Sequence, residues 1–325
     1  MENLVVSFQI IMPLFLYMLL GYAAKKRGLL TKELNDGVNQ LMFAMFLPVL
    51  LFKTLYQDDL SGFGQAAFIP YAMAGTVASF LLLFTLFSRL EKDPAKRGSL
   101  IQGAFRGNSV LYGLPVAISI FGEGNTAEVA IVLAAIIPIY NVLSVLVLEI
   151  CGQAARSEDP RVKLSLGSVN WKSVGWSIFK NPLIHAVILG ILANLSGVSF
   201  PSYAEKAING VAGVVTPMAF VLLGSAFNLS SAGENKRSIL LASLMKLVVN
   251  PFIFLLLPIY WGWSGPVLGA ILISFGTPTA VSSFPMAKAL HCDGDLAGEI
   301  VVVTSAASIV TMFLWIFVLK QMMLI

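Results

Sequence analysis

Charge is scarce in this sequence. Asp, Glu, Lys and Arg make up 12% of its 325 residues, whereas soluble domains carry about 25%. Hydrophobic residues account for 57%, and the mean hydropathy is +0.84. A soluble fold of this length lacks the interior volume to hide so much apolar surface. The composition therefore excludes an ordinary soluble domain and predicts an all-α polytopic membrane protein.

Cysteine and histidine are also rare, with two residues of each. Cys151 and Cys292 fall at expected cytoplasmic helix ends, so we interpret them as reduced thiols. The histidines lack metal-ligand spacing, and the sequence has no P-loop, Rossmann glycine pattern, HExxH or CxxC motif. We therefore expect no metal, no cofactor and no enzyme activity. The net charge of +4 comes from clusters between apolar runs, which is not the pattern of a nucleic-acid-binding surface.

Apolar runs that are long enough to span a bilayer, about 17–25 residues, occur ten times. Their approximate limits are 4–24, 37–56, 66–88, 98–121, 127–151, 174–195, 204–227, 237–260, 266–290 and 296–320. Most of the 21 lysines and arginines follow the odd-numbered runs. By the positive-inside rule, both termini lie outside and the connector 152–172 lies in the cytoplasm. We expect a multi-pass protein of the plasma or inner membrane.

The two halves of the chain, 1–151 and 173–325, align with a shift that changes by one residue along their length. The aligned pairs include Pro13 with Pro182 and Pro48 with Pro217 at a shift of 169, and Phe105 with Phe275 and Pro115 with Pro285 at a shift of 170. Proline and glycine matches carry weight because these residues constrain the backbone. Each half holds five spans, and this odd number inverts the second half. We predict two inverted five-helix repeats, as in many secondary transporters.

Two expected spans are interrupted near their middle. The fourth contains FRGNSVLYGLPVAISIFG (105–122), and the ninth contains SFGTPTAVSSFPMAKAL (274–290). Proline frees a backbone carbonyl, and this is tolerated at membrane depth where the backbone is buried in protein or lines a cavity. Matched breaks in inverted halves should cross near the bilayer midplane. The helix N-termini there suit an anion such as a carboxylate.

The candidate substrate-binding residues come from these two breaks. Asn108 can donate and accept hydrogen bonds. Two interpretations stay open for Arg106, which offers an anion a counter-charge or extends to the cytoplasmic interface. The same question applies to Lys246 in the eighth span, which contacts substrate, extends to the interface or bonds a neighbouring helix. The full candidate set is Arg106, Gly107, Asn108, Ser109, Pro115, Thr277, Pro278, Thr279, Ser282, Ser283 and Pro285.

On these residues the chain resembles the auxin efflux carrier family, and within it the bacterial, malonate-permease-like members. The fourth-span segment, with its asparagine and Gly-x-Pro, is the most specific motif. IYNVLSV (139–145) and TPTAVSSFPMAKAL (277–290) are similar to the fifth and ninth spans of the family. Nearly the whole chain is covered. Pro285 departs from the plant carriers, whose second proline would fall near Ser283, and their long central loop is missing.

The resemblance implies a scaffold of spans 1, 2, 6 and 7, often the dimer contact, and a moving core of spans 3–5 and 8–10. Helices 4 and 9 would cross at the substrate site, in an elevator-like mechanism. We expect a secondary active or facilitative transporter of a mono- or dicarboxylate, with H⁺ or Na⁺ as a possible coupling ion. The alternatives are a sodium-coupled symporter of bile-acid-symporter-like architecture and a non-transporting membrane sensor or binding protein.

Overall fold

The computed structural model describes residues 2–57, 67–156, 182–226 and 235–325. Within these ranges the regular structure is helical, apart from one isolated bridge between two extended residues. The prediction of an all-α protein is therefore confirmed for the described residues. Most of the predicted connector 152–172, and the start of the sixth expected span, lie outside them.

The first half contains α1 (Glu2–Lys26), α2 (Lys32–Leu41), the π-helical segment η1 (Met42–Phe46), α3 (Leu47–Gln57), α4 (Phe68–Leu90), α5 (Pro94–Phe105), the π-helical segment η3 (Ser109–Gly113), α6 (Leu114–Phe121) and α7 (Ala127–Arg156). The second half contains α9 (Pro182–Leu195), α10 (Ser202–Ala226), α11 (Lys236–Leu244), the π-helical segment η5 (Met245–Val249), α12 (Asn250–Tyr260), α13 (Gly265–Gly276), α14 (Ser283–Ala289) and α15 (Gly294–Gln321).

Six continuous helical runs among the described residues are long and apolar enough to cross a membrane. They are Glu33–Gln57, Phe68–Leu90, Ala127–Arg156, Ser202–Ser225, Lys236–Tyr260 and Gly294–Gln321, and the shorter apolar helices are Ser109–Phe121 and Gly265–Gly276. These runs match the expected spans 2, 3, 5, 7, 8 and 10. The structure thus supports a multi-pass helical protein, while the full number of ten spans stays a prediction.

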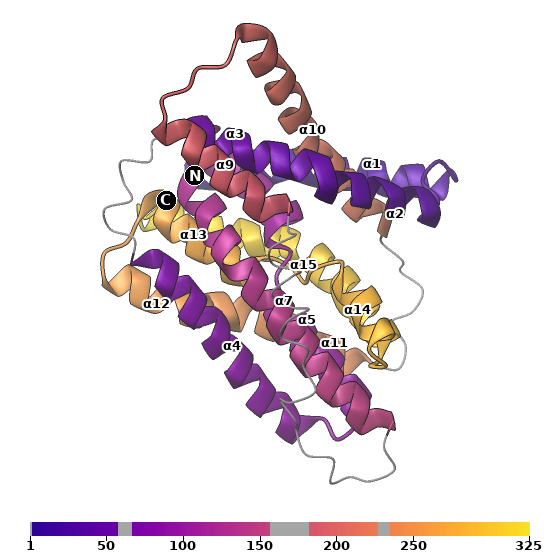
Figure 1. The fold of residues 1–325 in the computed structure, drawn as a ribbon. Coiled ribbons are helices and arrows are strands. Elements are labelled where there is room, and N and C mark those ends of the chain that lie inside the picture. Colours follow the sequence, from indigo (N-terminus) through magenta and orange to yellow (C-terminus); the bar gives the residue numbers. More distant parts are fainter. Residues whose placement is uncertain (1, 58–66, 157–181, 227–234) are drawn as a thin grey trace.

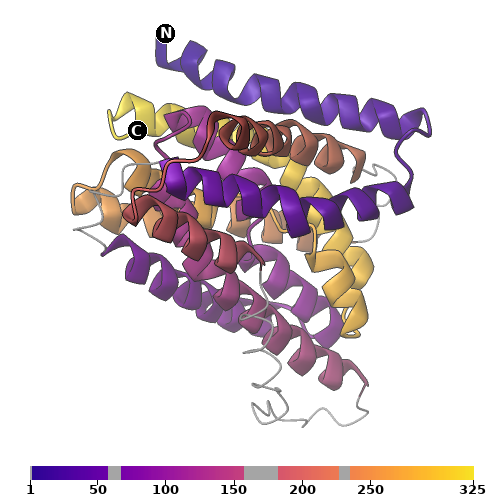
Figure 2. The same cartoon turned by 45° about the horizontal axis from the view of Figure 1, so that its top comes forward.

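The helices form two groups. α1, α2, α3, α9 and α10 make a layer along the top of Figure 1, and the other helices form a bundle beneath it. Within the layer, α1 packs against α10, and α3 packs against α9 and α10. Figure 2 shows α1 as the outermost helix of this layer. We call these groups the layer and the bundle.

Two helices of the layer approach each other closely through glycine. A Cβ atom on Gly21 of α1 would overlap the carbonyl oxygen of Val221, and one on Gly224 of α10 would overlap the carbonyl oxygen of Met18. Helices inside a membrane gain stability from such close backbone packing, because lipid offers no hydrophobic driving force between them. These two glycines therefore fix the distance between α1 and α10.

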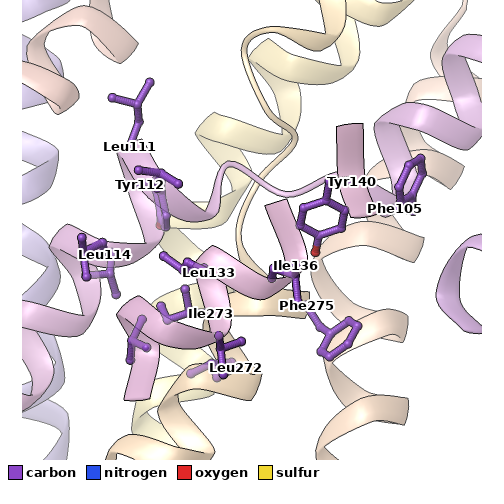
Figure 3. Packing of buried hydrophobic residues seen from close by; sticks show 14 of the residues in the cluster. Phe105, Leu111, Tyr112, Leu114, Leu133, Ile136, Tyr140, Leu272, Ile273 and Phe275 are labelled. Atoms are coloured by element: carbon purple, nitrogen blue, oxygen red, sulfur yellow. The ribbon is translucent and has the colours of Figure 1, made fainter. Parts of the chain in front are cut away.

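The helix α7 runs through the middle of the bundle and contacts α4, α5 and α13. Its residues Leu133 and Ile136 are fully buried, and Figure 3 shows them among side chains from both divided spans. The Tyr140 hydroxyl donates a hydrogen bond of 2.7 Å to the carbonyl oxygen of Ser274. Phe275 stacks on Phe254, with ring centroids 4.3 Å apart. This packing holds the end of α13 against α7 and α12.

Large apolar side chains remain exposed on the outside of both groups. Examples are Leu20, Leu81, Leu192, Phe252 and Val310, from five different helices. Soluble monomers rarely expose so many large apolar residues, whereas lipid tails would cover them in a bilayer. One ion pair joins the layer to the bundle: the Lys53 ammonium lies 2.7 Å from the Glu123 carboxylate, which is 68% exposed.

Both cysteines are free and buried in the bundle. Cys151 lies in α7, and Cys292 lies between α14 and α15. A Cβ atom on Gly98 would be 2.6 Å from the Cys292 sulfur and 2.9 Å from the Cys151 Cβ atom, so three segments meet there. Burial, with smaller contributions from Cys151 and Asp293, raises the pKa of the Cys292 thiol to about 12.

We expect Cys292 to react with maleimide about ten-fold or more slowly in the folded protein than after denaturation, because the thiolate is the nucleophile and is a minor form below its raised pKa. Reactivity should rise with pH as the pH approaches that value. Mass spectrometry of a Cys151→Ala variant isolates this thiol, and a Lys288→Cys variant on the exposed face of α14 provides a fast-reacting control. Rapid labelling of folded Cys292 at pH 7 would contradict its burial.

Candidate functional site at the helix crossing

The two interrupted spans meet at their breaks. α5 ends at Phe105 and α13 ends at Gly276, and each is followed by an extended connector. The connectors run antiparallel: the Asn108 N–H donates to the Pro278 carbonyl oxygen at 2.7 Å, and the Ala280 N–H donates to the Arg106 carbonyl oxygen at 3.2 Å. Gly107 and Thr279 form the bridge between them. The structure thus brings the two sequence breaks into direct main-chain contact.

The contact is centred on a pair that the internal alignment matches. Asn108 falls on Pro278 at a shift of 170 residues, and these two residues share the shortest hydrogen bond between the connectors. Proline lacks an N–H donor but keeps its carbonyl acceptor. A proline at position 278 can therefore accept this hydrogen bond at the centre of the crossing.

Most of the candidate hydroxyl groups hold the crossing together. The Thr279 hydroxyl donates to the Gly103 carbonyl oxygen at 2.6 Å, and its N–H donates to the Thr304 hydroxyl at 3.1 Å. The Ser109 and Thr277 hydroxyl oxygens lie 3.3 Å apart. All these side chains are buried. Thr279 in particular ties α13, α5 and α15 at one point.

Asn108 faces a hollow beside the crossing. The hollow has a cavity volume of about 10 Å³ and is lined by Asn35, Asn39, Asn108, Leu111, Ala219, Leu222, Leu223 and Val281. Asn108 is 6% exposed, and its side-chain Nδ2 is buried without a hydrogen-bond partner among the described residues. A buried amide that lacks a partner costs free energy, so its presence needs an explanation.

The hollow lies between the layer and the bundle. Asn35 and Asn39 come from α2, and the apolar wall of Ala219, Leu222 and Leu223 comes from α10. A buried Asn35 Oδ1 also lacks a partner in the described part of the chain. Ligand sites in proteins combine such apolar walls with a few polar groups. The arrangement places amide groups on both sides of a small space.

The sequence reasoning missed Asn35 and Asn39. They stand four residues apart on α2, so they share one face of that helix. The expected second span began at residue 37, which left Asn35 in a loop. The available signal was two asparagines one turn apart at the start of an apolar run. The sequence does not show that they line the same hollow as Asn108, because this depends on how α2 packs against α10.

Arg106 lies beside the crossing but does not line the hollow. Its guanidinium donates to the Met286 sulfur at 2.8 Å and to the Asn141 Oδ1 at 2.9 Å. Both partners are uncharged, and the side chain is partly exposed. The structure therefore places this charge between α7 and α14, next to the break and away from Asn108.

The remaining candidates sit in the second halves of the divided spans. Pro115 is buried in α6, which directly continues the helical run that begins with η3 at Ser109. Ser282 precedes α14, and the buried Ser283 hydroxyl has no partner in the described residues. Pro285 lies within α14, and its side chain is outside the description. None of these lines the hollow, so Asn108 is the candidate that does so among the described residues.

The backbone after Asn108 adds donors to the same place. The π-helical segment η3 begins at Ser109, and its first intrahelical hydrogen bonds run from the Tyr112 and Gly113 N–H groups to the Asn108 carbonyl oxygen, at 3.1 and 3.2 Å. The N–H groups of residues 109–111 precede these bonds. The first N–H groups of a helix have no acceptor within it and carry partial positive charge. Leu111 of this segment lines the hollow. A helix N-terminus next to an amide suits a negatively charged group.

Comparison with known proteins agrees with this architecture. The sequence profile of the family described as membrane transport protein matches residues 6–316. The chain belongs to this family, the auxin efflux carriers. An uncharacterized transporter of Methanothermobacter thermautotrophicus is 24% identical over 319 residues, which cover 96% of this chain and 98% of that protein. One from Methanocaldococcus jannaschii is 21% identical over 320 residues, covering 95% and 98%.

These matches run from end to end, so this auxin efflux carrier family member is comparable in length to both archaeal relatives. Family membership and the apolar helices together identify a multi-pass membrane transporter. The resemblance noted in the fourth, fifth and ninth spans is therefore confirmed at the level of the family.

Proposed function

We propose that this transporter moves a small organic anion, a mono- or dicarboxylate, through the hollow at the helix crossing. The observation that carries the proposal is the buried Asn108 amide: its Nδ2 has no partner among the described residues, and Asn108 lines that hollow. A substrate carboxylate oxygen would accept a hydrogen bond from this group. The unpaired donor would then be satisfied when substrate is bound.

The surroundings of Asn108 favour an anion over a cation. The residues that line the hollow include three asparagines and no carboxylate, so a cation would find amide oxygens but no counter-charge. An anion would meet amide donors and the N-terminal end of η3. With a cavity volume of about 10 Å³, the hollow has room for about one water molecule in this conformation. Movement between the layer and the bundle must therefore widen it before a substrate can enter.

The position of the hollow supports an elevator-like mechanism. Its walls come from α2 and α10 of the layer and from the crossing in the bundle. In this mechanism the layer is the scaffold and the bundle, spans 3–5 and 8–10, is the moving core. Movement of the bundle past the layer would expose Asn108 to each side in turn. A substrate that drives this change must bind the two states with different affinity.

The proposal keeps the remaining expectations about topology. The protein lies in the plasma or inner membrane, and its ten spans form two inverted repeats. Both termini lie outside the cell, and the central connector lies in the cytoplasm. The layer is the expected contact in a homodimer. The surrounding bilayer covers the exposed apolar side chains of α1, α4 and α15.

The test is an uptake measurement with a matched pair of variants. A thermal-shift screen of mono- and dicarboxylates on the purified protein first identifies the substrate for uptake into proteoliposomes. We expect Asn108→Ala to lower uptake at limiting substrate by about 10- to 100-fold, because a hydrogen bond to a charged group contributes about 1.5–3 kcal/mol. Asn125→Ala is the control, since Asn125 is exposed and donates to the Phe121 carbonyl oxygen.

Unchanged uptake by Asn108→Ala would remove this site from the mechanism. Tight binding of a carboxylate without any uptake by the wild-type protein would favour the non-transporting sensor instead.

A further inference from the structure

Lys246 is a fully buried charge that the proposed site does not use. It lies in η5, with 0% of its surface exposed. Its ammonium nitrogen is 3.4 Å from the carbonyl oxygens of Phe105 and Phe275. No ion pair in the described part of the chain involves it. An unpaired buried charge is costly, so the partial negative charge of these two carbonyl groups is what can stabilise the ammonium.

Those carbonyl groups belong to the ends of the two divided spans. Phe105 is the last residue of α5, and Phe275 is the last but one of α13. The final carbonyls of a helix lack N–H donors within it, and each C-terminus carries about half a negative charge. Two C-termini at one point amount to about one negative charge. One ammonium group neutralises them.

Lys246 also lies directly behind the connector that presents Asn108. A Cβ atom on Gly107 would be 3.1 Å from the ammonium nitrogen, 2.5 Å from the Thr277 hydroxyl oxygen and 3.0 Å from the Ser109 hydroxyl oxygen. The ammonium therefore contacts two carbonyl oxygens and borders the same space around Gly107 as the two hydroxyl groups. Carbonyls of unwound helices and the C-terminal ends of half-helices coordinate Na⁺ in sodium-coupled transporters with divided helices.

We propose that the Lys246 ammonium is a built-in cation of the anion site and occupies the position that a coupling Na⁺ would need. This inference rests on the proposed function and defines its coupling. The side chain neutralises the two helix C-termini and provides positive charge behind Asn108. Because the charge is covalently attached to the bundle, it accompanies the substrate in every state, and Na⁺ has no site to occupy at the crossing.

The first test compares salts and needs no substrate. Thermal unfolding of the purified wild-type protein is measured in NaCl and in choline chloride at equal concentration, and we expect the same midpoint in both. Lys246→Ala removes the ammonium and leaves the oxygen atoms around an empty space. Its midpoint should fall, and Na⁺ should raise it again by about 2–4 °C relative to choline. n-Propylammonium, the group that the substitution removes, should act in the same way.

Two variants control for shape and for the general loss of a lysine. Lys246→Met fills the space without charge, so its midpoint should not respond to Na⁺. Lys288→Ala removes an exposed lysine of α14 and should behave as the wild type does. For the carboxylate found by screening, Lys246→Met should weaken affinity by about ten-fold or more, whereas Lys246→Arg, which keeps the charge, should retain binding.

A Na⁺-specific rise in the wild-type midpoint would overturn the proposal, and so would wild-type carboxylate affinity in Lys246→Met. If Lys246→Ala and Lys246→Met do not fold, two measurements still test the proposal. They are the salt comparison on the wild-type protein and carboxylate binding by Lys246→Arg. A failed carboxylate screen would count against the proposed function, while the salt comparison would still show whether Lys246 excludes Na⁺.

Discussion

Gly224→Leu is expected to leave little folded protein. Any side chain at this position would overlap the carbonyl oxygen of Met18, which is backbone and cannot rotate away. The reciprocal contact between Gly21 and Val221 means that α1 and α10 cannot separate at one point without losing the other. Overlap with backbone in a packed interior destabilises by more than about 3 kcal/mol. Fluorescence-detected size-exclusion chromatography and thermal unfolding measure the loss.

Gly213→Leu is the matched control on the same helix. A Cβ atom at Gly213 meets nothing within 4 Å, so the same substitution there should leave the elution profile unchanged and the midpoint close to that of the wild type. Equal behaviour of the two variants would show that α1 and α10 do not pack as closely as the structure indicates. Normal folding of Gly224→Leu alone would lead to the same conclusion.

Gly107→Ala is expected to fold but to lose transport. The added methyl group would lie 2.5 Å from the Thr277 hydroxyl oxygen and 3.0 Å from the Ser109 hydroxyl oxygen. Since both neighbours belong to the crossing, the connector must shift and take Asn108 with it. A displacement of about 1 Å at a binding site can reduce the rate by about 100-fold. Uptake of the carboxylate found by screening, with folding checked by chromatography, measures the effect.

Gly276→Ala provides the comparison at the end of the other divided span. The nearest atom to its added methyl group is the Leu272 Cδ1 at 3.1 Å, which is the far end of a flexible side chain. We expect this variant to keep most of its uptake. A Gly107→Ala protein that transports as well as Gly276→Ala would mean that the connector tolerates a side chain and that its fit against Thr277 is unimportant.

The sequence located the helices well because hydropathy depends on residues close together in the chain. The expected runs 66–88 and 296–320 correspond to α4 and α15 within a few residues. The two breaks were also visible, because Asn108 and Pro278 interrupt apolar runs. The prolines were a less uniform guide: Pro278 lies in the break at 277–282, whereas Pro115 lies inside the helical run Ser109–Phe121, after the break at 106–108.

The rest of the site depends on contacts between distant segments. Asn35 and Asn39 line the hollow together with Asn108 because α2 packs against α10, whose residues form the apolar wall. The environment of Lys246 was equally hidden, since its partners are main-chain carbonyl groups that every residue possesses. Sequence analysis finds unusual side chains, but it cannot tell which carbonyl groups are brought together. For Lys246 it left three roles open, and the structure places the side chain against two neighbouring helices.

The connection between the two halves at the crossing is made by main-chain atoms. The donors at positions 108 and 280 are peptide N–H groups, which every residue except proline supplies. The Asn108 side chain therefore contributes nothing to that connection. If Asn108 binds the substrate as proposed, exchange of its amide for another polar group changes which solute is accepted and leaves the main-chain connection intact. Solute selectivity and the connection between the halves would then depend on different atoms of one residue, so a new substrate could be acquired without a change in the crossing.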